Sequence, residues 1–395
     1  MTRHAGLWLS TAALLLAAAP ASATGFADWD LKPASVDVGG WTASLGGSAN
    51  LTGYSASQDA GAGRTGGTAS LFFDPEVSRL FENGWRVGLK GTINAYHDQL
   101  SGDNYGNDVF QKAYLFVATP YGRVEIGQQD GAAYKMAMTG PLVADAPAID
   151  DANITFFRDP STGKAFTNVF AVRSGVFATA NDAKLSYYTP RLLGVQLGVS
   201  YTPHMVKDGL PFISAGPHVA DRQDNLIDAA VNYTGFFGHT SLGLYAGLSA
   251  GHNAARTAGH DDLLGWALGG ELDYDLGEAT LALGGAYHQS NGYTLDPMQA
   301  FASGTTRVVH ASTKLTMGSW LAGLEYSTGS ADAEVALPKL DTTGYEASVG
   351  YALNSNLQLT AGWQHLRFTR DSGVFYNGLP HTSMDAGLLY LNFHV

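Results

Sequence analysis

Sixteen segments of this chain alternate apolar and polar side chains with a period of two, and the connections between them alternate between short and long. In the segment 266–276, Trp266, Leu268 and Leu272 share one face, whereas Glu271 and Asp273 share the other. Such a period is typical of β-strands with one apolar face, so an all-β fold is expected. The predicted strands cover residues 41–55, 67–79, 84–97, 109–118, 122–130, 182–189, 193–202, 225–235, 238–250, 262–275, 278–290, 305–317, 319–329, 342–353, 356–369 and 382–395.

The rhythm of the connections indicates how these strands are arranged. Short connections such as "TPYG" (119–122) and "GFFG" (235–238) alternate with long ones such as 203–224 and 291–304. An even number of strands, with tight turns at one end and long loops at the other, is typical of an outer-membrane β-barrel. In a bilayer every backbone group must be paired, so the sheet has to close on itself. We therefore predict a 16-stranded antiparallel transmembrane β-barrel.

The C-terminal segment "GLLYLNFHV" is consistent with a closed sheet. Leu389, Leu391, Phe393 and Val395 lie on one side of its pattern, and no polar tail follows them. Most chain ends fray, but the last strand of a barrel is held by the first. A soluble β-sandwich also has alternating strands. Sixteen of them in one chain, with hardly any run that is apolar on both faces, favour a single wide barrel.

Residues 1–23 have the layout of a secretory signal peptide: a basic start, an apolar run and the small residues Ala21-Ser22-Ala23. We expect an exported chain with a single domain over residues 24–395.

The net charge of -13 argues against nucleic acid as a partner. The chain has no cysteine, and beyond residue 23 no segment approaches 18 consecutive apolar residues. Disulfides and a helical membrane fold are thereby excluded.

Two stretches resemble a known family. "AYLFVATPYGRVEIGQQDGAAY" and "KLSYYTPRLLGVQLGVSYTP" are similar to the fourth to seventh strands of the general diffusion porins of Gram-negative outer membranes. The resemblance implies a homotrimer among outer-membrane lipids that passes small hydrophilic solutes and ions by passive diffusion. It also implies that the long third loop, here 131–181, folds into the lumen and forms the constriction.

Some positions depart from the family pattern. Gln111, Gln128 and Ser186 stand where the family has arginines that face the lumen. Val395 stands where the family has a terminal aromatic residue that helps assembly. The usual arginine ladder is therefore thinned, and the effect on assembly stays open.

The lumen is the expected functional site, because pore width and lining charge decide selectivity in a channel. Loop 131–181 supplies Asp145, Asp150 and Asp151 as candidate constriction acids. The alternation along the strands predicts that several bases of the barrel wall point into the lumen and face these acids. Gln111 and Glu125 are further candidate wall residues. A transverse field between acids and bases would favour hydrated, dipolar solutes. The candidate bases are Arg86, Lys90, Arg123 and Lys184.

Acids prevail among the predicted inward residues, so we expect a weak preference for cations. The acids are Asp74, Glu76, Glu125, Asp228, Glu271, Asp273, Glu325 and Glu346, and the bases include Lys314 besides the four above.

Three other functions stay open: a porin selective for a sugar or an anion, an outer-membrane β-barrel enzyme such as a lipase, and a soluble secreted adhesin. No cofactor and no metal are expected. "GAGRTG" (61–66) lacks the βαβ context of a nucleotide site. His252, His260, Asp261 and Asp262 match no tight metal-ligand spacing.

Overall fold

The computed structural model describes residues 30–59, 63–97, 110–144, 148–149, 174–176, 179, 181–204, 223–253, 262–291, 305–331, 339–370 and 381–395. The predicted signal peptide lies outside these ranges.

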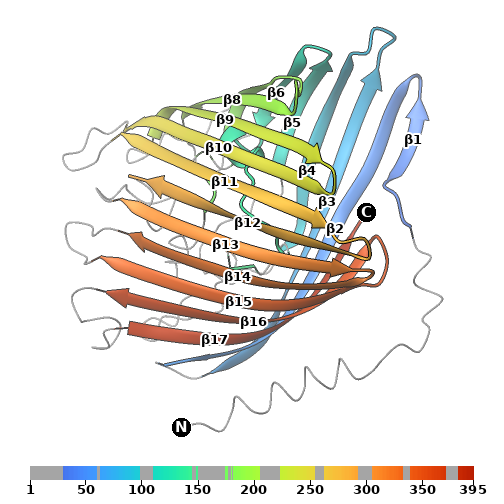
Figure 1. The fold of residues 1–395 in the computed structure, drawn as a ribbon. Coiled ribbons are helices and arrows are strands. Elements are labelled where there is room, and N and C mark those ends of the chain that lie inside the picture. Colours follow the sequence, from blue (N-terminus) through green and yellow to red (C-terminus); the bar gives the residue numbers. More distant parts are fainter. Residues whose placement is uncertain are drawn as a thin grey trace.

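Sixteen long strands, β2 to β17, form one closed antiparallel barrel (Figure 1). Each corresponds to one predicted segment, which confirms the predicted fold class. The strands are β2 (Trp41–Gln58), β3 (Arg64–Leu80), β4 (Arg86–His97), β5 (Phe110–Thr119), β6 (Gly122–Gln128), β7 (Ala183–Tyr188), β8 (Val195–His204), β9 (Gln223–Phe237), β10 (Thr240–Asn253), β11 (Leu263–Asp275), β12 (Ala279–Ser290), β13 (Thr306–Met317), β14 (Trp320–Ala331), β15 (Leu340–Ala352), β16 (Leu357–Arg370) and β17 (His381–His394).

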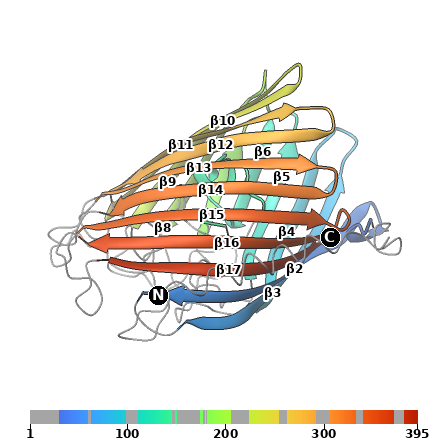
Figure 2. The ribbon, with the colours of Figure 1, turned by 60° about the horizontal axis from the view of Figure 1, so that its bottom comes forward.

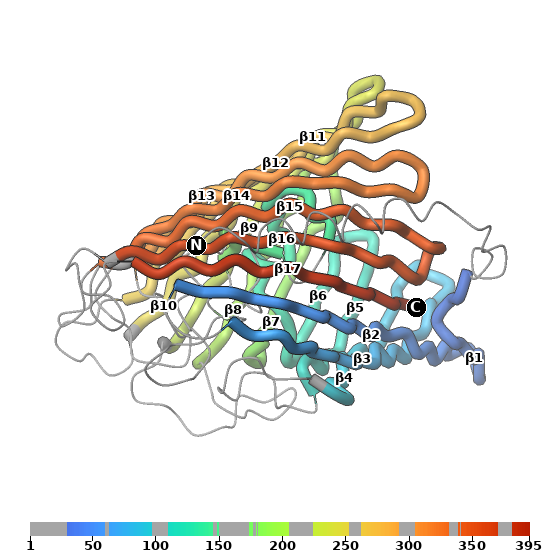
Figure 3. Tube along the Cα trace, turned by 90° about the horizontal axis from the view of Figure 1, so that it is seen from below, coloured from blue at the N-terminus to red at the C-terminus, as the bar shows by residue number. Residues whose placement is uncertain are grey.

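The barrel closes between its last and its first long strand, which run side by side in Figure 3. β17 pairs with β2 from Met384↔Gln58 to His394↔Ser48. Beyond this register, Val395 and Gly47 exchange two backbone hydrogen bonds of 2.9 and 3.1 Å. The chain end that stops in mid-strand is therefore part of the closing seam, as predicted.

A further short strand, β1 (Ala34–Val38), has no counterpart among the predicted segments. It pairs with the beginning of β2, from Ala34↔Leu45 to Val38↔Trp41. The turn between them contains Gly39 and Gly40 with φ of 59° and 80°, values that glycine adopts without strain. Every residue of β1 is exposed, so burial imposes no period that the sequence could show.

The two faces of the wall have opposite character. Large apolar side chains such as Leu51, Val77 and Leu197 are exposed on the outside, where lipid would surround them. Polar side chains such as Ser200 and Asn232 point inward and are buried. This distribution is the one expected of a membrane barrel with a polar lumen.

The outer face of β16 changes from apolar to polar along the strand. Trp363 is followed on the same face by His365 and Arg367, and β16 pairs with β15 and β17 without a register shift. A bulge is thus excluded as the cause. These residues approach the end of the barrel at which the long connections begin, and Nδ1 of His365 lies 3.0 Å from Oδ1 of Asp385. We interpret this end of the strand as lying beyond the apolar part of the bilayer.

The short turns between β11 and β12, between β13 and β14, and between β15 and β16 lie at the same end of the barrel as the C-terminus (Figures 1 and 2). After β6 the chain forms a single helical turn, α2 (Ala132–Lys135), which contacts β7, β8, β9 and β10. Among the described residues, no helix is long and apolar enough to cross a membrane.

Candidate functional site

The inward face of the barrel divides into two sectors, which differ in what covers them. We call the inward faces of β3 to β6 the open sector. We call those of β7 to β16 the covered sector, because residues 129–144, 148 and 149 contact each of these strands. The contacts are hydrogen bonds, packed side chains and close approaches to wall residues. In the open sector the same segment reaches β5 and β6 through Asp130 and Lys135.

The open sector begins with an ion pair between β3 and β4. Nη2 of Arg86 donates to Oε1 of Glu76 over 2.5 Å, and Nε of Arg86 donates to Oγ of Ser78 over 3.2 Å. Nζ of Lys90 lies 3.9 Å from Oε2 of Glu76. The side chains of Arg86 and Lys90 are 50% and 42% exposed. Both candidate wall bases thus reach open space while sharing one carboxylate.

Glu125 is the buried centre of a second charge cluster. Its carboxylate accepts from Nε of Arg123 over 2.6 Å and from Nζ of Lys135 over 2.7 and 2.8 Å. The guanidinium of Arg123 also lies over the ring of Phe116, 4.0 Å from its centre. Glu125 side-chain exposure is 0%, so both bases serve to neutralise a desolvated carboxylate.

Lys135 belongs to α2, so its bond to Glu125 ties the loop to the wall. Its ammonium also lies between the rings of Tyr114 and Tyr188, 5.4 and 5.0 Å from their centres. Burial lowers the pKa of Lys135 from its usual value, and attraction to Glu125 opposes this effect. The sequence offers one signal for this residue, the short helical pattern after Gly131.

Lys112 is a further wall base, which shares the inward face of β5 with the buried Tyr114 and Phe116. Between β4 and β5 the register shifts, with Thr92 opposite Lys112 and Ile93 opposite Phe110. Gln111 therefore occupies the extra position of a β-bulge, and Lys112 donates to Oδ2 of Asp130 over 2.6 Å.

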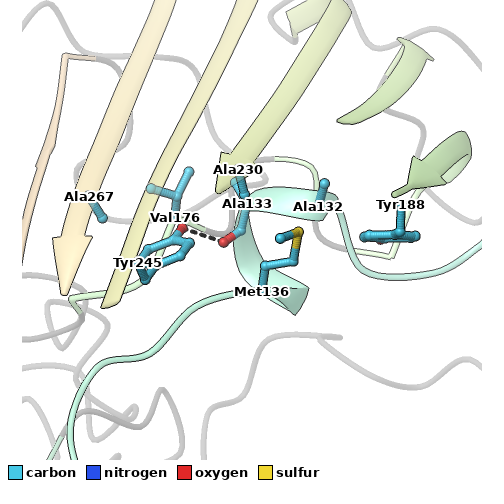
Figure 4. Close-up of a cluster of buried hydrophobic side chains, with 8 residues drawn as sticks. All are labelled: Ala132, Ala133, Met136, Val176, Tyr188, Ala230, Tyr245 and Ala267. Atoms are coloured by element: carbon cyan, nitrogen blue, oxygen red, sulfur yellow. Dashed lines mark hydrogen bonds between the residues drawn. The ribbon is translucent and has the colours of Figure 1, made fainter. Parts of the chain in front are cut away.

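The loop meets the covered sector through buried hydrogen bonds at α2. The N–H of Ala132 donates to Oγ of Ser200 over 2.8 Å, and Ser200 and Ser186 share a hydroxyl contact of 2.8 Å. The hydroxyl of Tyr245 donates to the carbonyl of Ala133. Figure 4 shows the alanines of α2 in one buried cluster with Tyr188, Ala230 and Tyr245 of the neighbouring strands.

Lys184 lies on the inward face of β7 but is only 3% exposed. Its ammonium donates to the carbonyls of Gln129 and Asp182 over 2.5 and 2.7 Å. It therefore binds the two ends of the connection between β6 and β7, and it is covered rather than presented to open space like Arg86.

Farther along, the loop follows the wall as far as β16. The carbonyl of Val143 accepts from Nε2 of Gln358 over 2.7 Å, and the N–H of Ile149 donates to Oε2 of Glu325 over 3.2 Å. Asp145, Asp150 and Asp151 lie outside the described residues. Their role at the constriction stays a prediction.

A family model described as Gram-negative porin matches residues 10–371. The chain belongs to the Gram-negative porin family. This confirms the predicted family. The porin is an outer-membrane protein, and its barrel forms a channel.

This porin is also similar to individual proteins. An uncharacterized protein of Rickettsia bellii (strain RML369-C) is 30% identical over 115 residues, which span 25% of this porin and 26% of that protein. This porin thus matches about a quarter of that relative's length.

Solved structures show the same fold. The anion-selective porin from Comamonas acidovorans superimposes with a TM-score of 0.55 at 15% identity, over 90% of this porin and 100% of that chain. Outer-membrane expressed OmpT of Vibrio cholerae gives 0.53 at 13% identity, over 92% and 100%. The trimer form of in-vitro folded OmpT of Vibrio cholerae gives 0.51 at 15% identity, over 90% and 99%.

Proposed function

We propose that this porin passes small hydrophilic solutes and ions by passive diffusion, with a weak preference for cations. The observation that carries the preference is the excess of acids on the inward faces of the described strands. By strand parity the inward acids are Asp74, Glu76, Glu125, Asp224, Asp228, Glu271, Asp273, Asp275, Glu325 and Glu346, and the inward bases are Arg64, Arg86, Lys90, Lys112, Arg123, Lys184 and Lys314. A negative lining raises the local concentration of cations.

The distribution of these charges is uneven, which supports a transverse field. Most bases lie in the open sector, and most acids lie in the covered sector. We propose that Asp145, Asp150 and Asp151 add to the acidic side and face Arg86, Lys90 and Arg123 across the constriction. Such a field would orient hydrated dipoles and disfavour apolar solutes.

A solute-selective porin is the second candidate. Its support is the stacking of Arg123 on Phe116 and of Lys135 between two tyrosine rings, which places cations beside aromatic faces in the lumen. The Comamonas acidovorans porin of the same fold is anion-selective. Saturable block of conductance by one sugar or one anion would favour this candidate.

We further propose that the porin acts as a homotrimer and as a channel rather than an enzyme. The trimer form of OmpT supports the first statement, and membership of a porin family supports the second. Cross-linking in detergent would test the trimer. Hydrolysis of ester substrates by purified protein would contradict the second statement.

The reversal potential in a KCl gradient across a planar bilayer tests the preference directly. We expect a potential of the sign that indicates faster passage of K⁺ than of Cl⁻. A potential of the opposite sign would overturn the proposed preference and leave the channel itself in place.

A further inference from the structure

Six strands of the covered sector carry an inward glycine where the loop passes over them. These glycines, which we call the seat, are Gly198, Gly243, Gly269, Gly284, Gly323 and Gly344, on β8, β10, β11, β12, β14 and β15. Glycine weakens a strand interior, and it often marks a place where another backbone approaches closely. Here the approaching segment comprises residues 136–144 and 149 of the same chain.

Two glycines of the seat lie against the backbone of the loop. A Cβ atom at Gly269 would lie 2.1 Å from the carbonyl oxygen of Met138, and one at Gly284 would lie 2.8 Å from Cα of Gly140. Ordinary contact begins at 3.4 Å. Backbone atoms cannot rotate away as a flexible side chain can, so a side chain at Gly269 has to displace the loop. One at Gly284 would also meet the carbonyl oxygen of Gly270 on the neighbouring strand, at 2.6 Å.

The other contacts are with loop side chains. A Cβ atom at Gly243 would lie 2.7 Å from Sδ of Met138, and one at Gly323 would lie 2.4 Å from Cγ2 of Val143. One at Gly344 would lie 2.7 Å from Cγ1 of Ile149. Apolar loop side chains thus fill the spaces that missing wall side chains leave.

The loop has a matching small residue. Gly140 has a φ of 112°, and a Cβ atom there would lie 2.5 Å from Oγ of Ser312 and 3.0 Å from the carbonyl carbon of Gly284. At this point neither the wall residue Gly284 nor the loop residue Gly140 has a side chain, so the two backbones lie in direct contact.

We propose that the six glycines are positioning residues that set the width of the channel. They act through the loop: because they have no side chain, residues 136–144, 148 and 149 lie close against the wall, and the remaining cross-section stays open to solutes. Larger residues on the wall would push the loop toward the open sector and lower the size limit for solutes. The proposal rests on the channel function described above.

Gly269→Ala tests the seat, and Gly265→Ala is its matched control. Both glycines face inward on β11, but a Cβ atom at Gly265 would meet only Ser290 and the carbonyl of Gln289, none closer than 3.3 Å. Single-channel conductance and the swelling of liposomes in sugars of graded size would be measured. We expect Gly269→Ala to lower the conductance by roughly a third and to exclude the largest permeant sugar, because conductance follows the narrowest cross-section. Gly265→Ala should match the wild type.

A rescue experiment separates loop displacement from damage to the sheet. At Gly243 a Cβ atom would meet the Met138 side chain and no other atom within 3.8 Å. Gly243→Val should therefore narrow the channel, and Met138→Ala in the same chain should restore conductance and size limit. At Gly269 no such rescue is expected, because Met138→Ala leaves the obstructing carbonyl in place.

A cysteine pair keeps the proposal testable if these variants fail to fold. The chain has no cysteine, so Val143→Cys with Gly323→Cys would be its only thiols. Oxidation should join them, because Val143 already lies against Gly323. Two results would contradict the proposal that the seat glycines set the channel width. One is failure of the two cysteines to cross-link, and the other is a folded Gly269→Ala variant with wild-type conductance and size limit. A wild type that does not conduct would instead contradict the channel function.

Discussion

The open and the covered sectors of the lumen use charged side chains for different purposes. Arg86 in the open sector pairs with Glu76 and remains half exposed, so its charge can act on passing ions. Lys184 in the covered sector is buried, and its ammonium donates to the carbonyls of Gln129 and Asp182. The same type of group therefore contributes to selectivity in one sector and to loop attachment in the other.

Glu125 connects the two sectors, and its substitution should have the largest effect. The carboxylate of Glu125 is fully buried, so Glu125→Gln leaves the charges of Arg123 and Lys135 beside a neutral, buried amide. We expect a loss of about 2–3 kcal/mol, below the figure for a fully buried pair because both bases stay about one-third exposed. The midpoint of urea-induced unfolding would measure the loss of stability. The current noise of the open channel would report whether the loop moves more once Lys135 loses its partner.

Glu76→Gln is the matched control in the open sector. Its partners Arg86 and Lys90 are about half exposed, so a change in unfolding free energy below about 1 kcal/mol is expected. Equal losses in the two variants would remove the distinction between the sectors.

Lys184→Met should have the next largest effect, and only on stability. Without the ammonium the carbonyls of Gln129 and Asp182 lose a buried donor, which should lower the unfolding free energy by about 1–2 kcal/mol. The reversal potential should stay at the wild-type value, because this charge is covered. A clear shift in reversal potential would show that Lys184 acts on ions after all.

The sequence predicts the barrel well because one physical rule repeats in every strand. Lipid outside and polar groups inside impose a period of two on every strand. An even number of antiparallel strands makes the connections alternate between short turns and long loops. Lumen details depend on contacts between distant segments and do not leave such a period. The bulge at Gln111 breaks the parity of β5, so that Phe110 pairs with Ile93 on the outer face, and Lys135 reaches Glu125 only because α2 lies against the wall. The sequence does not predict β1 because all of its residues are exposed and therefore show no apolar–polar alternation.

Arg86→Ala should change selectivity with little effect on stability. Its removal leaves Glu76 with Lys90 at 3.9 Å as the remaining ion pair, so the open sector becomes more negative. We expect the ratio of K⁺ to Cl⁻ permeability to rise about twofold. The unfolding free energy should change by less than about 1 kcal/mol, because the arginine is half exposed. An unchanged reversal potential would show that ions do not pass near this pair.

The smallest expected effect is a pH dependence that arises from Lys135, the residue that links loop and wall. Burial lowers its pKa from the usual 10.5, with Glu125 opposing, so the folded channel releases this proton at a lower pH than the unfolded chain does. Between the lowered pKa and 10.5 the folded state binds fewer protons, and this group's contribution to stability therefore rises with pH. Over the same window the lumen loses one positive charge, so the preference for cations should increase. Reversal potentials recorded between about pH 7 and pH 10 should show a small rise in the permeability ratio, by about a fifth. Lys135→Met should begin at the higher ratio and lack this step, whereas a step of equal size in that variant would assign the titration to another group.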